Sequence, residues 1–107
     1  MGVHVLAVYI PKQDRADDLV AEMVEHVPLL RRLGLATGRP STVLRAADGT
    51  IVEHFEWVDR HAIDAAHEHP EVLAMWQRYD ACCTYGTLAD LPHADALFAE
   101  FEFLGSY

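Results

Sequence analysis

The chain has 107 residues, of which 51% are hydrophobic and 23% charged, so it has enough apolar material for one domain spanning residues 1–107. Its 17 acidic residues outnumber its 8 basic residues and give a net charge of −9. This charge argues against nucleic acid and anionic membranes as partners, because both attract clusters of Lys and Arg. We interpret the acidity mainly as an aid to solubility.

The sequence also gives information about localisation and about disulfide bonds. No apolar stretch approaches the length of a membrane span, and no basic flank precedes an apolar core at the N-terminus. We therefore expect a cytoplasmic protein. Cys82 and Cys83 are adjacent, which disfavours a disulfide between them, so we expect both to be small buried hydrophobic side chains.

Residues 3–10 are rich in β-branched side chains and predict the first strand. Both alternating sets of side chains are apolar apart from His4: Val3, Val5, Ala7 and Tyr9 on one face, and Leu6, Val8 and Ile10 on the other. A strand that is apolar on both faces is buried on both. We expect one face to contact the helices of its own subunit and the other to contact a second copy of the chain.

Apolar residues then recur every three or four positions across residues 19–30, which predicts a helix. Acidic residues precede this stretch, and two arginines and a glycine follow at residues 31–34, as the ends of a helix favour. Pro28 interrupts the pattern and removes a backbone hydrogen bond toward Val24. We therefore expect a kink or two helical pieces.

Residues 42–47 and 51–58 predict a hairpin around Asp48-Gly49. If the turn has two residues, one face of the hairpin is expected to be core, and it carries Leu44, Ala46, Ile51, Glu53, Phe55 and Trp57. The other face then mixes apolar with polar residues and carries Val43, Arg45, Val52, His54, Glu56 and Val58. A loop one residue longer would change this parity.

The remaining sequence predicts a second helix, a weak fourth strand and a short last helix. Asp59 is a candidate N-cap, and the helix is expected to break at His69-Pro70 and to continue to about Tyr79. Residues 82–88 indicate a strand. A C-terminal helix is predicted to open at Pro92, because apolar residues recur at helical spacing at Ala94, Leu97, Phe98 and Phe101.

The resulting order, β-α-β-β-α-β, predicts an α+β protein of the ferredoxin-like class with an antiparallel sheet and an added C-terminal helix. No Gly-rich phosphate loop and no nucleophile elbow is present in the sequence. The candidate sites are therefore looser groups of residues.

Three such groups are candidates. Arg45, His54 and Glu56 would supply a general base and an anion-binding group, or alternatively cross-strand ion pairs at a dimer interface. The aromatic residues would form core or would line a pocket for a flat apolar ligand beside the helix break; they are Tyr9, Phe55, Trp57, Trp76 and Tyr79.

The third group gathers at the helix break. Its members, His61, His67, Glu68 and His69, invite a metal-binding interpretation. An H-x-H pair points one way on a strand but not on a helix, and here it lies at a helix break before Pro70, where the sequence does not define its geometry. We favour polar surface and capping roles and expect no bound metal.

The chain resembles the dimeric α/β-barrel superfamily, which includes antibiotic-biosynthesis-type monooxygenases and haem-degrading proteins. The resemblance covers nearly the whole chain and is carried by element order, length and the strand-to-helix passage Phe55-Glu56-Trp57-Val58-Asp59-Arg60-His61-Ala62-Ile63. It implies that two ferredoxin-like subunits pair their sheets into one barrel.

The functional residues of that superfamily are not matched here. Oxygenating members use an Asn on or near the sheet, and this chain contains no Asn. Haem-degrading members place a Trp and, ten residues later, a haem-binding His on the second helix. Aligning Trp57 with the tryptophan common before that helix puts Ala66 and Trp76 at those positions, and a one-residue shift brings only His67 to the first.

We therefore expect a homodimeric barrel that binds a small apolar molecule near Trp57, His67, Trp76 and Tyr79, without a cofactor. Its chemistry would be cofactor-independent oxygenation or isomerisation of an aromatic or polyketide-like compound. His54 or His67 would accept the proton. Arg45 would bind the developing oxyanion. The alternative is a non-catalytic dimerisation or ligand-sensing module in which the aromatic residues are core.

Overall fold

The computed structural model describes residues 2–107 and has the α+β architecture that the sequence predicts. All strand pairs in its five-stranded open sheet are antiparallel, in the order β4-β1-β3-β2-β5. This arrangement is compatible with a ferredoxin-like fold. In chain order the elements are β1 (Val3–Pro11), α1 (Ala16–Arg32), β2 (Thr42–Arg45), β3 (Ile51–Trp57), α2 (Arg60–Ala66), α3 (Pro70–Cys82), β4 (Cys83–Gly86), the short 3-10 helix η1 (Leu88–Asp90) and β5 (Glu102–Gly105).

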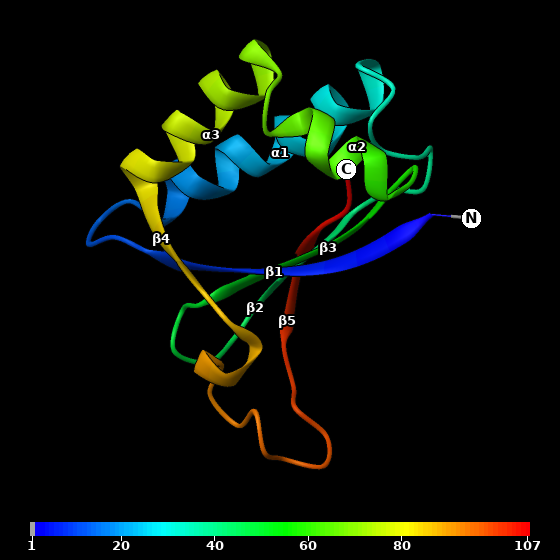
Figure 1. Ribbon diagram of the computed structural model, residues 1–107. Helices are drawn as coiled ribbons and strands as arrows, with labels where there is room; N and C mark the ends of the chain where they lie inside the picture. The colour runs from blue at the N-terminus through cyan, green and yellow to red at the C-terminus, as the bar shows by residue number, and fades with distance from the viewer. Residues whose placement is uncertain (1) are drawn as a thin grey trace.

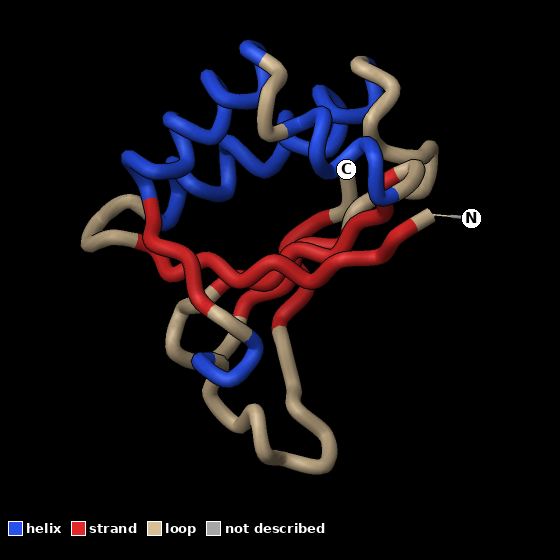
Figure 2. The backbone as a smooth tube through the Cα atoms, viewed as in Figure 1, coloured by secondary structure: helices blue, strands red, loops and turns tan. Residues whose placement is uncertain are grey.

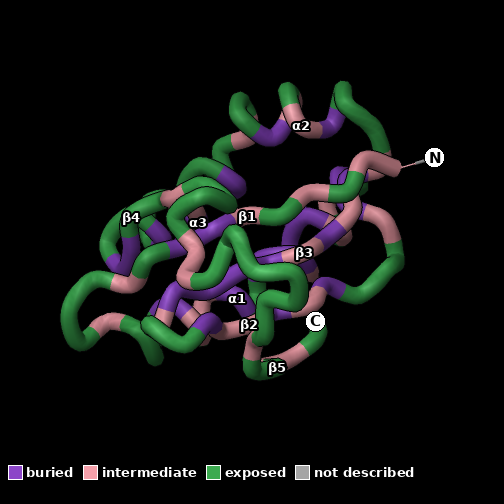
Figure 3. Tube along the Cα trace, turned by 90° about the horizontal axis from the view of Figure 1, so that it is seen from below, coloured by how far each residue is buried: buried purple, intermediate pink, exposed green. Residues whose placement is uncertain are grey.

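The α-helices lie on one side of the sheet, and the connection from β4 to β5 hangs from the other side (Figure 1, Figure 2). Burial is concentrated along β3 and the inner sides of the helices, whereas most of the β4–β5 connection is exposed (Figure 3). The protein therefore has one covered and one largely uncovered sheet face. Among the residues described, no helix is both long and apolar enough to cross a bilayer.

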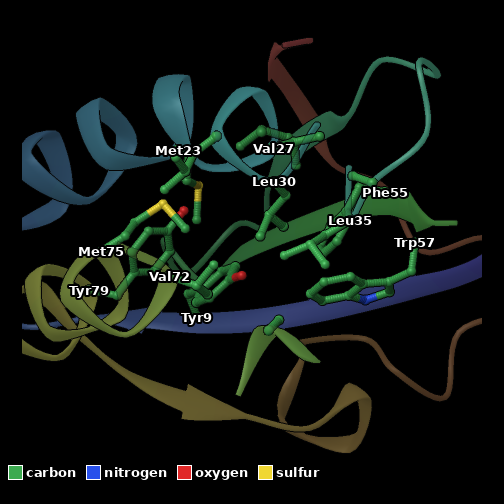
Figure 4. Packing of buried hydrophobic residues seen from close by; sticks show 14 of the residues in the cluster. Tyr9, Met23, Val27, Leu30, Leu35, Phe55, Trp57, Val72, Met75 and Tyr79 are labelled. Carbon is green, nitrogen blue, oxygen red and sulfur yellow. The ribbon is translucent and has the colours of Figure 1, made fainter. Parts of the chain in front are cut away.

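The core fills the space between the sheet and its helices, and Figure 4 shows side chains from both layers packed together. The periodic apolar residues of α1 meet those of α3 there, as an amphipathic helix requires. The fully buried members from these two helices are Leu19, Met23, Val27, Leu30, Val72, Met75 and Tyr79.

Helix α1 continues through Pro28 as one element, so the expectation of two helical pieces is wrong. Proline removes the backbone hydrogen bond toward the residue four positions earlier. That residue is Val24, whose side chain is 43% exposed, so this side of the helix is open to water that can satisfy the free carbonyl. Packing of the opposite side holds the helix together.

The predicted break in the second helical region is present. Asp59 caps α2, because its Oδ1 accepts a 2.8 Å hydrogen bond from the backbone N–H of Ala62. Helix α2 ends at Ala66, and α3 begins at Pro70, where the missing N–H of proline costs nothing. The helix break thus follows directly from local sequence signals.

The hairpin register differs from the two-residue turn considered above. Ala46 N–H donates to the Thr50 carbonyl at 2.8 Å, which leaves a three-residue loop in which Gly49 has a φ of +94°. Val43 therefore lies opposite Glu53 and is fully buried, whereas Leu44 lies opposite Val52. The longer loop inverts the predicted parity of β2.

The predicted C-terminal helix is wrong. After η1 the chain runs through turns and then adds β5 to β2 at the edge of the sheet. Leu97 and Phe98 are 89% and 83% exposed, so helical spacing here has no surface to pack against. Helical periodicity stabilises a helix only when its apolar side is buried.

Candidate functional site

A cavity of about 660 Å³ lies between β1 and α3, within the size range of small-molecule pockets. Its inner wall is apolar and aromatic, and its rim carries exposed side chains of α3 and β4. The residues that line it are Val5, Leu6, Ala7, Val8, Tyr9, His26, Phe55, Trp57, His67, Leu73, Trp76, Gln77, Tyr79, Asp80, Tyr85 and Gly86.

The five aromatic residues singled out from the sequence all line this cavity, and so does His67; the five are Tyr9, Phe55, Trp57, Trp76 and Tyr79. Tyr9 and Tyr79 lie side by side, with ring centroids 5.3 Å apart (Figure 4). These side chains are therefore both part of the core and the wall of a cavity, so the two interpretations of the aromatic group are not exclusive.

Strand pairing and helix periodicity place these side chains. β1 runs antiparallel to β3, with Val5 opposite Phe55, so alternate residues of both strands face the helices. Trp76 and Tyr79 are three residues apart on α3 and therefore lie on the same side of it. Residues from three elements thus converge on one space.

A buried polar network lies at the base of the cavity. Glu53 on β3 is 0% exposed, and its Oε1 lies 2.9 Å from Nδ1 of His26 on α1. The same oxygen accepts a 2.9 Å hydrogen bond from the hydroxyl of Tyr9. His26 is 2% exposed and contributes to the cavity wall. A carboxylate, an imidazole and a phenol are therefore held together away from water.

The indole of Trp76 identifies the tautomer of His26. Its Nε1–H donates to Nε2 of His26 at 3.4 Å, so Nε2 carries a lone pair. The proton of a neutral imidazole then resides on Nδ1 and is donated to Glu53. This assignment makes Nε2 the proton-accepting atom of the pair, in the wall of the cavity.

Two polar atoms at the bottom of the cavity have no hydrogen-bond partner among the described residues: Oε2 of Glu53 and the hydroxyl of Tyr79. Burial, together with the negative charge of Glu53, raises the pKa of Tyr79 above its ordinary value. The same two causes raise the pKa of Tyr9 well above its ordinary value. Both phenols are therefore neutral at physiological pH, and that of Tyr9 donates its proton to Glu53.

The histidines at the helix break bind backbone atoms close to them in the chain. Nδ1 of His67 lies 2.7 Å from the carbonyl of Ile63, and its ring packs against Trp76 at a centroid distance of 5.0 Å. Nδ1 of His69 accepts from the N–H of Glu71 at 3.3 Å and caps α3. Within residues 2–107 no group of three or more His, Cys, Asp or Glu side chains is placed to hold a metal ion.

The polar cluster considered on the hairpin is divided between the two faces of the sheet. His54 and Glu56 lie on the outer face, where His4 joins them at 3.0 Å from each. Arg45 pairs with Ile51 in the ladder and therefore faces the other way, and its guanidinium binds Glu102 at 2.7 Å. The cause is again the three-residue loop, so Arg45 is not beside His54.

Sequence reasoning did not select Glu53 and His26, although both left a signal. Glu53 is the only charged residue in the predicted core set of the hairpin. His26 lies three residues after Met23 and four before Leu30, within the apolar stripe of α1. A charged or titratable residue inside an apolar pattern indicates a buried polar pair, but the partner becomes visible only when β3 and α1 pack together.

Comparison of the chain with protein-family models, curated proteins and solved structures finds no match in any of the three. The resemblance to the dimeric α/β-barrel superfamily therefore stays a prediction. The chemistry of the site rests on its own geometry, a histidine–carboxylate pair at the base of an aromatic cavity.

Proposed function

We propose that the protein binds a small, mostly apolar aromatic molecule in the cavity and removes a proton from it. The observation that carries this proposal is the 2.9 Å contact between Nδ1 of His26 and Oε1 of Glu53. A carboxylate bonded to Nδ1–H leaves Nε2 as the base and stabilises the imidazolium that forms. His26 replaces His54 and His67 as the proton acceptor that we favour.

Proton removal is the shared first step of the two reactions expected for such a protein. The proton passes to Nε2 of His26 and leaves the bonding electron pair on the substrate as a carbanion or enolate. Return of the proton at another carbon gives an isomer. Addition of dioxygen to the carbanion, followed by the proton held on His26, gives a hydroperoxide without a cofactor.

Binding without chemistry is the second candidate, and one contact favours it. The N–H of Trp76 donates to Nε2 of His26 at 3.4 Å, so the lone pair of the proposed base is already hydrogen-bonded. If this hydrogen bond persists when a ligand binds, the cavity acts as a sensor or carrier site. The two functions therefore differ in whether Nε2 exchanges a proton with the ligand.

Deuterium exchange into a probe tests the proposal. β-Tetralone, an aromatic ketone with acidic C–H groups, is incubated in D₂O, and loss of its proton signals is followed by NMR. We expect the protein to accelerate exchange over buffer and His26→Asn to lose roughly a hundredfold of that rate. The matched control is His93→Asn in the exposed β4–β5 connection, which should retain it.

The outcomes separate the candidates. Binding of the probe with no accelerated exchange favours the sensor function. Exchange that survives in His26→Asn but disappears in His54→Asn would move the reaction to the outer sheet face. Equal rates in both variants and in the wild type would contradict proton transfer by either histidine.

We also propose that the uncovered sheet face pairs with a second copy of the chain. Leu6 and Phe103 on this face are 53% and 62% exposed, and Leu97 and Phe98 in the β4–β5 connection are 89% and 83% exposed. Apolar side chains gathered on one face and on an adjoining loop mark an interaction site. A twofold pairing would bury both sets together, because each subunit offers the same surface.

Sedimentation velocity tests this pairing. The wild type should be dimeric at micromolar concentration, and Leu6→Lys should weaken the dimer at least tenfold by placing a charge in the interface. Val24→Lys on the exposed side of α1 is the matched control and should stay dimeric. A monomeric wild type would overturn the proposed pairing and leave the cavity proposal intact.

A further inference from the structure

The cavity has a one-sided charge. None of its lining residues is Lys or Arg, and the rim carries the carboxylate of Asp80. The carboxylate of Glu53 lies directly behind the wall, bonded to Tyr9 and His26. Any charged ligand in this space therefore meets negative groups and no positive side chain in the wall.

Among the described residues, no Lys or Arg side chain contacts Glu53. Its neighbours at Oε1 are the hydroxyl of Tyr9 and the Nδ1–H of His26, and Oε2 has no partner among the described residues. Because Nε2 of His26 accepts from Trp76, the tautomer that fits these contacts carries its single proton on Nδ1. A fully buried carboxylate without a counter-charge is costly, and a nearby cation relieves that cost.

The aromatic wall also favours a cation. The π faces of Trp and Tyr carry negative electrostatic potential and attract cations. Trp57 and Tyr79 are 5% and 1% exposed and line the inner part of the cavity, and Trp76 flanks it on α3. An ammonium group attached to an aromatic ring would therefore meet favourable groups on both its charged and its apolar parts.

We infer that the ligand of this cavity is an aromatic compound with one positive charge, such as a protonated amine, and that Glu53 selects it against carboxylates. This inference rests on the proposed use of the cavity as a ligand site. It adds the charge class of the ligand and gives Glu53 a role in specificity besides orienting His26. The attraction between Glu53 and the positive group of the ligand acts in low-dielectric surroundings. It is therefore stronger than the attraction of a carboxylate on the surface at the same distance.

Isothermal titration calorimetry with three probes of one shape tests the inference at neutral pH. The probes are 1-naphthylmethylammonium, 1-naphthalenemethanol and 1-naphthoate, which are cationic, neutral and anionic. We expect the ammonium to bind at least about tenfold more tightly than the alcohol, and the carboxylate at least about tenfold more weakly.

Two variants that remove one negative charge each separate the site from the overall charge of −9. Glu53→Gln should bring the ammonium and the alcohol to similar affinity. Glu102→Gln, at an exposed position on β5, should retain the preference. A salt series on the wild type gives a second measure, because a buried attraction is screened far less than a surface attraction.

The outcomes distinguish this inference from the proposed function. If no probe binds, the cavity proposal fails and the inference fails with it. If the alcohol or the carboxylate binds as tightly as the ammonium, the cavity is a ligand site but the charge selection is wrong. A cation preference that is equal in both variants, or that disappears in high salt, would assign it to the surface and overturn the role of Glu53.

Discussion

The hydroxyl of Tyr9 donates a 2.9 Å hydrogen bond to Oε1 of Glu53, joining β1 to β3 beneath the cavity. The neighbouring phenol of Tyr79, equally buried, has no partner among the described residues. Two tyrosines whose rings are 5.3 Å apart thus differ in the use of the hydroxyl. They form a matched pair for measuring what the buried polar network contributes to stability.

Removing each hydroxyl should have opposite effects. Tyr9→Phe deprives a buried carboxylate of a donor and should lower the free energy of unfolding by about 1–3 kcal/mol. Tyr79→Phe removes a buried group that has no partner, so the free energy of unfolding should be unchanged or about 1 kcal/mol higher. Urea denaturation followed by circular dichroism measures both. Equal destabilisation by the two variants would mean that the hydroxyl of Tyr79 is bonded after all.

The pH dependence of stability should depend on Glu56 on the outer face. A hydrogen bond from Thr37 lowers the pKa of the Glu56 carboxyl, and Arg39 and His4 add to this effect. Because the folded-state pKa is below that of the unfolded chain, the stabilisation is present above about pH 4.3 and is lost as pH falls through the folded value. Urea midpoints between pH 7 and pH 3 should therefore fall less steeply in Glu56→Gln than in the wild type.

Glu100→Gln in the exposed connection before β5 is the control for this measurement. It makes the same chemical change away from Thr37 and Arg39, so its acid profile should follow that of the wild type. If Glu56→Gln and Glu100→Gln give the same profile, the contacts of Glu56 do not contribute to acid sensitivity.

The continuous path of α1 through Pro28 predicts a gain in stability on substitution. Pro28→Ala restores the N–H that can bond Val24 and improves helix propensity, partly offset by the greater freedom of the unfolded chain. The free energy of unfolding should rise by about 1–2 kcal/mol. Thermal melting followed by circular dichroism measures it, and a lower melting temperature would show that proline packing outweighs the missing bond.

The adjacent cysteines should be unreactive in the folded protein. Cys82 and Cys83 are 3% and 2% exposed, and burial raises the pKa of the Cys83 thiol to about 11. Only about 0.1% of that thiol is then ionised at pH 8. Iodoacetamide should label neither residue in the native state and both in guanidinium, as measured by mass spectrometry.

Thr84→Cys provides the matched control for alkylation, because residue 84 is the next position on β4 and is exposed. The new thiol should react at the rate of a free cysteine while Cys82 and Cys83 stay protected. Rapid labelling of the native pair at pH 8 would indicate that the end of α3 opens frequently.

The parts of the fold that were predictable depend on neighbours in the chain. The cap at Asp59 and the break before Pro70 are local, so the sequence contains the whole cause. The parity of β2 depends on one loop residue near Gly49, and a one-residue difference moves Val43 rather than Leu44 into the core. Short-range reasoning recognises such a hairpin but does not fix its register.

The C-terminal strand and the candidate site depend instead on contacts between residues that are distant in the sequence. β5 pairs with β2 across a long stretch of chain, and its register places Phe103 opposite Leu44, which no local pattern predicts. The aromatic lining was visible as composition, but the pair of Glu53 and His26 joins elements distant in the sequence. A buried polar residue can be suspected from its pattern, whereas its partner is defined only by packing.

β4 is shorter than β1 and, in the described part of the chain, leaves part of the edge of β1, beside the cavity, without a neighbouring strand. β3 pairs with β1 from Val3 to Tyr9, but β4 pairs only with Val8–Pro11, so within residues 2–107 the first half of β1 has no strand on that edge. Val5, Leu6 and Ala7 of this half line the cavity. A molecule entering there meets peptide groups as well as side chains. Alanine scanning leaves peptide groups in place and will understate this main-chain contribution, which backbone changes such as proline substitution or ester replacement would reveal.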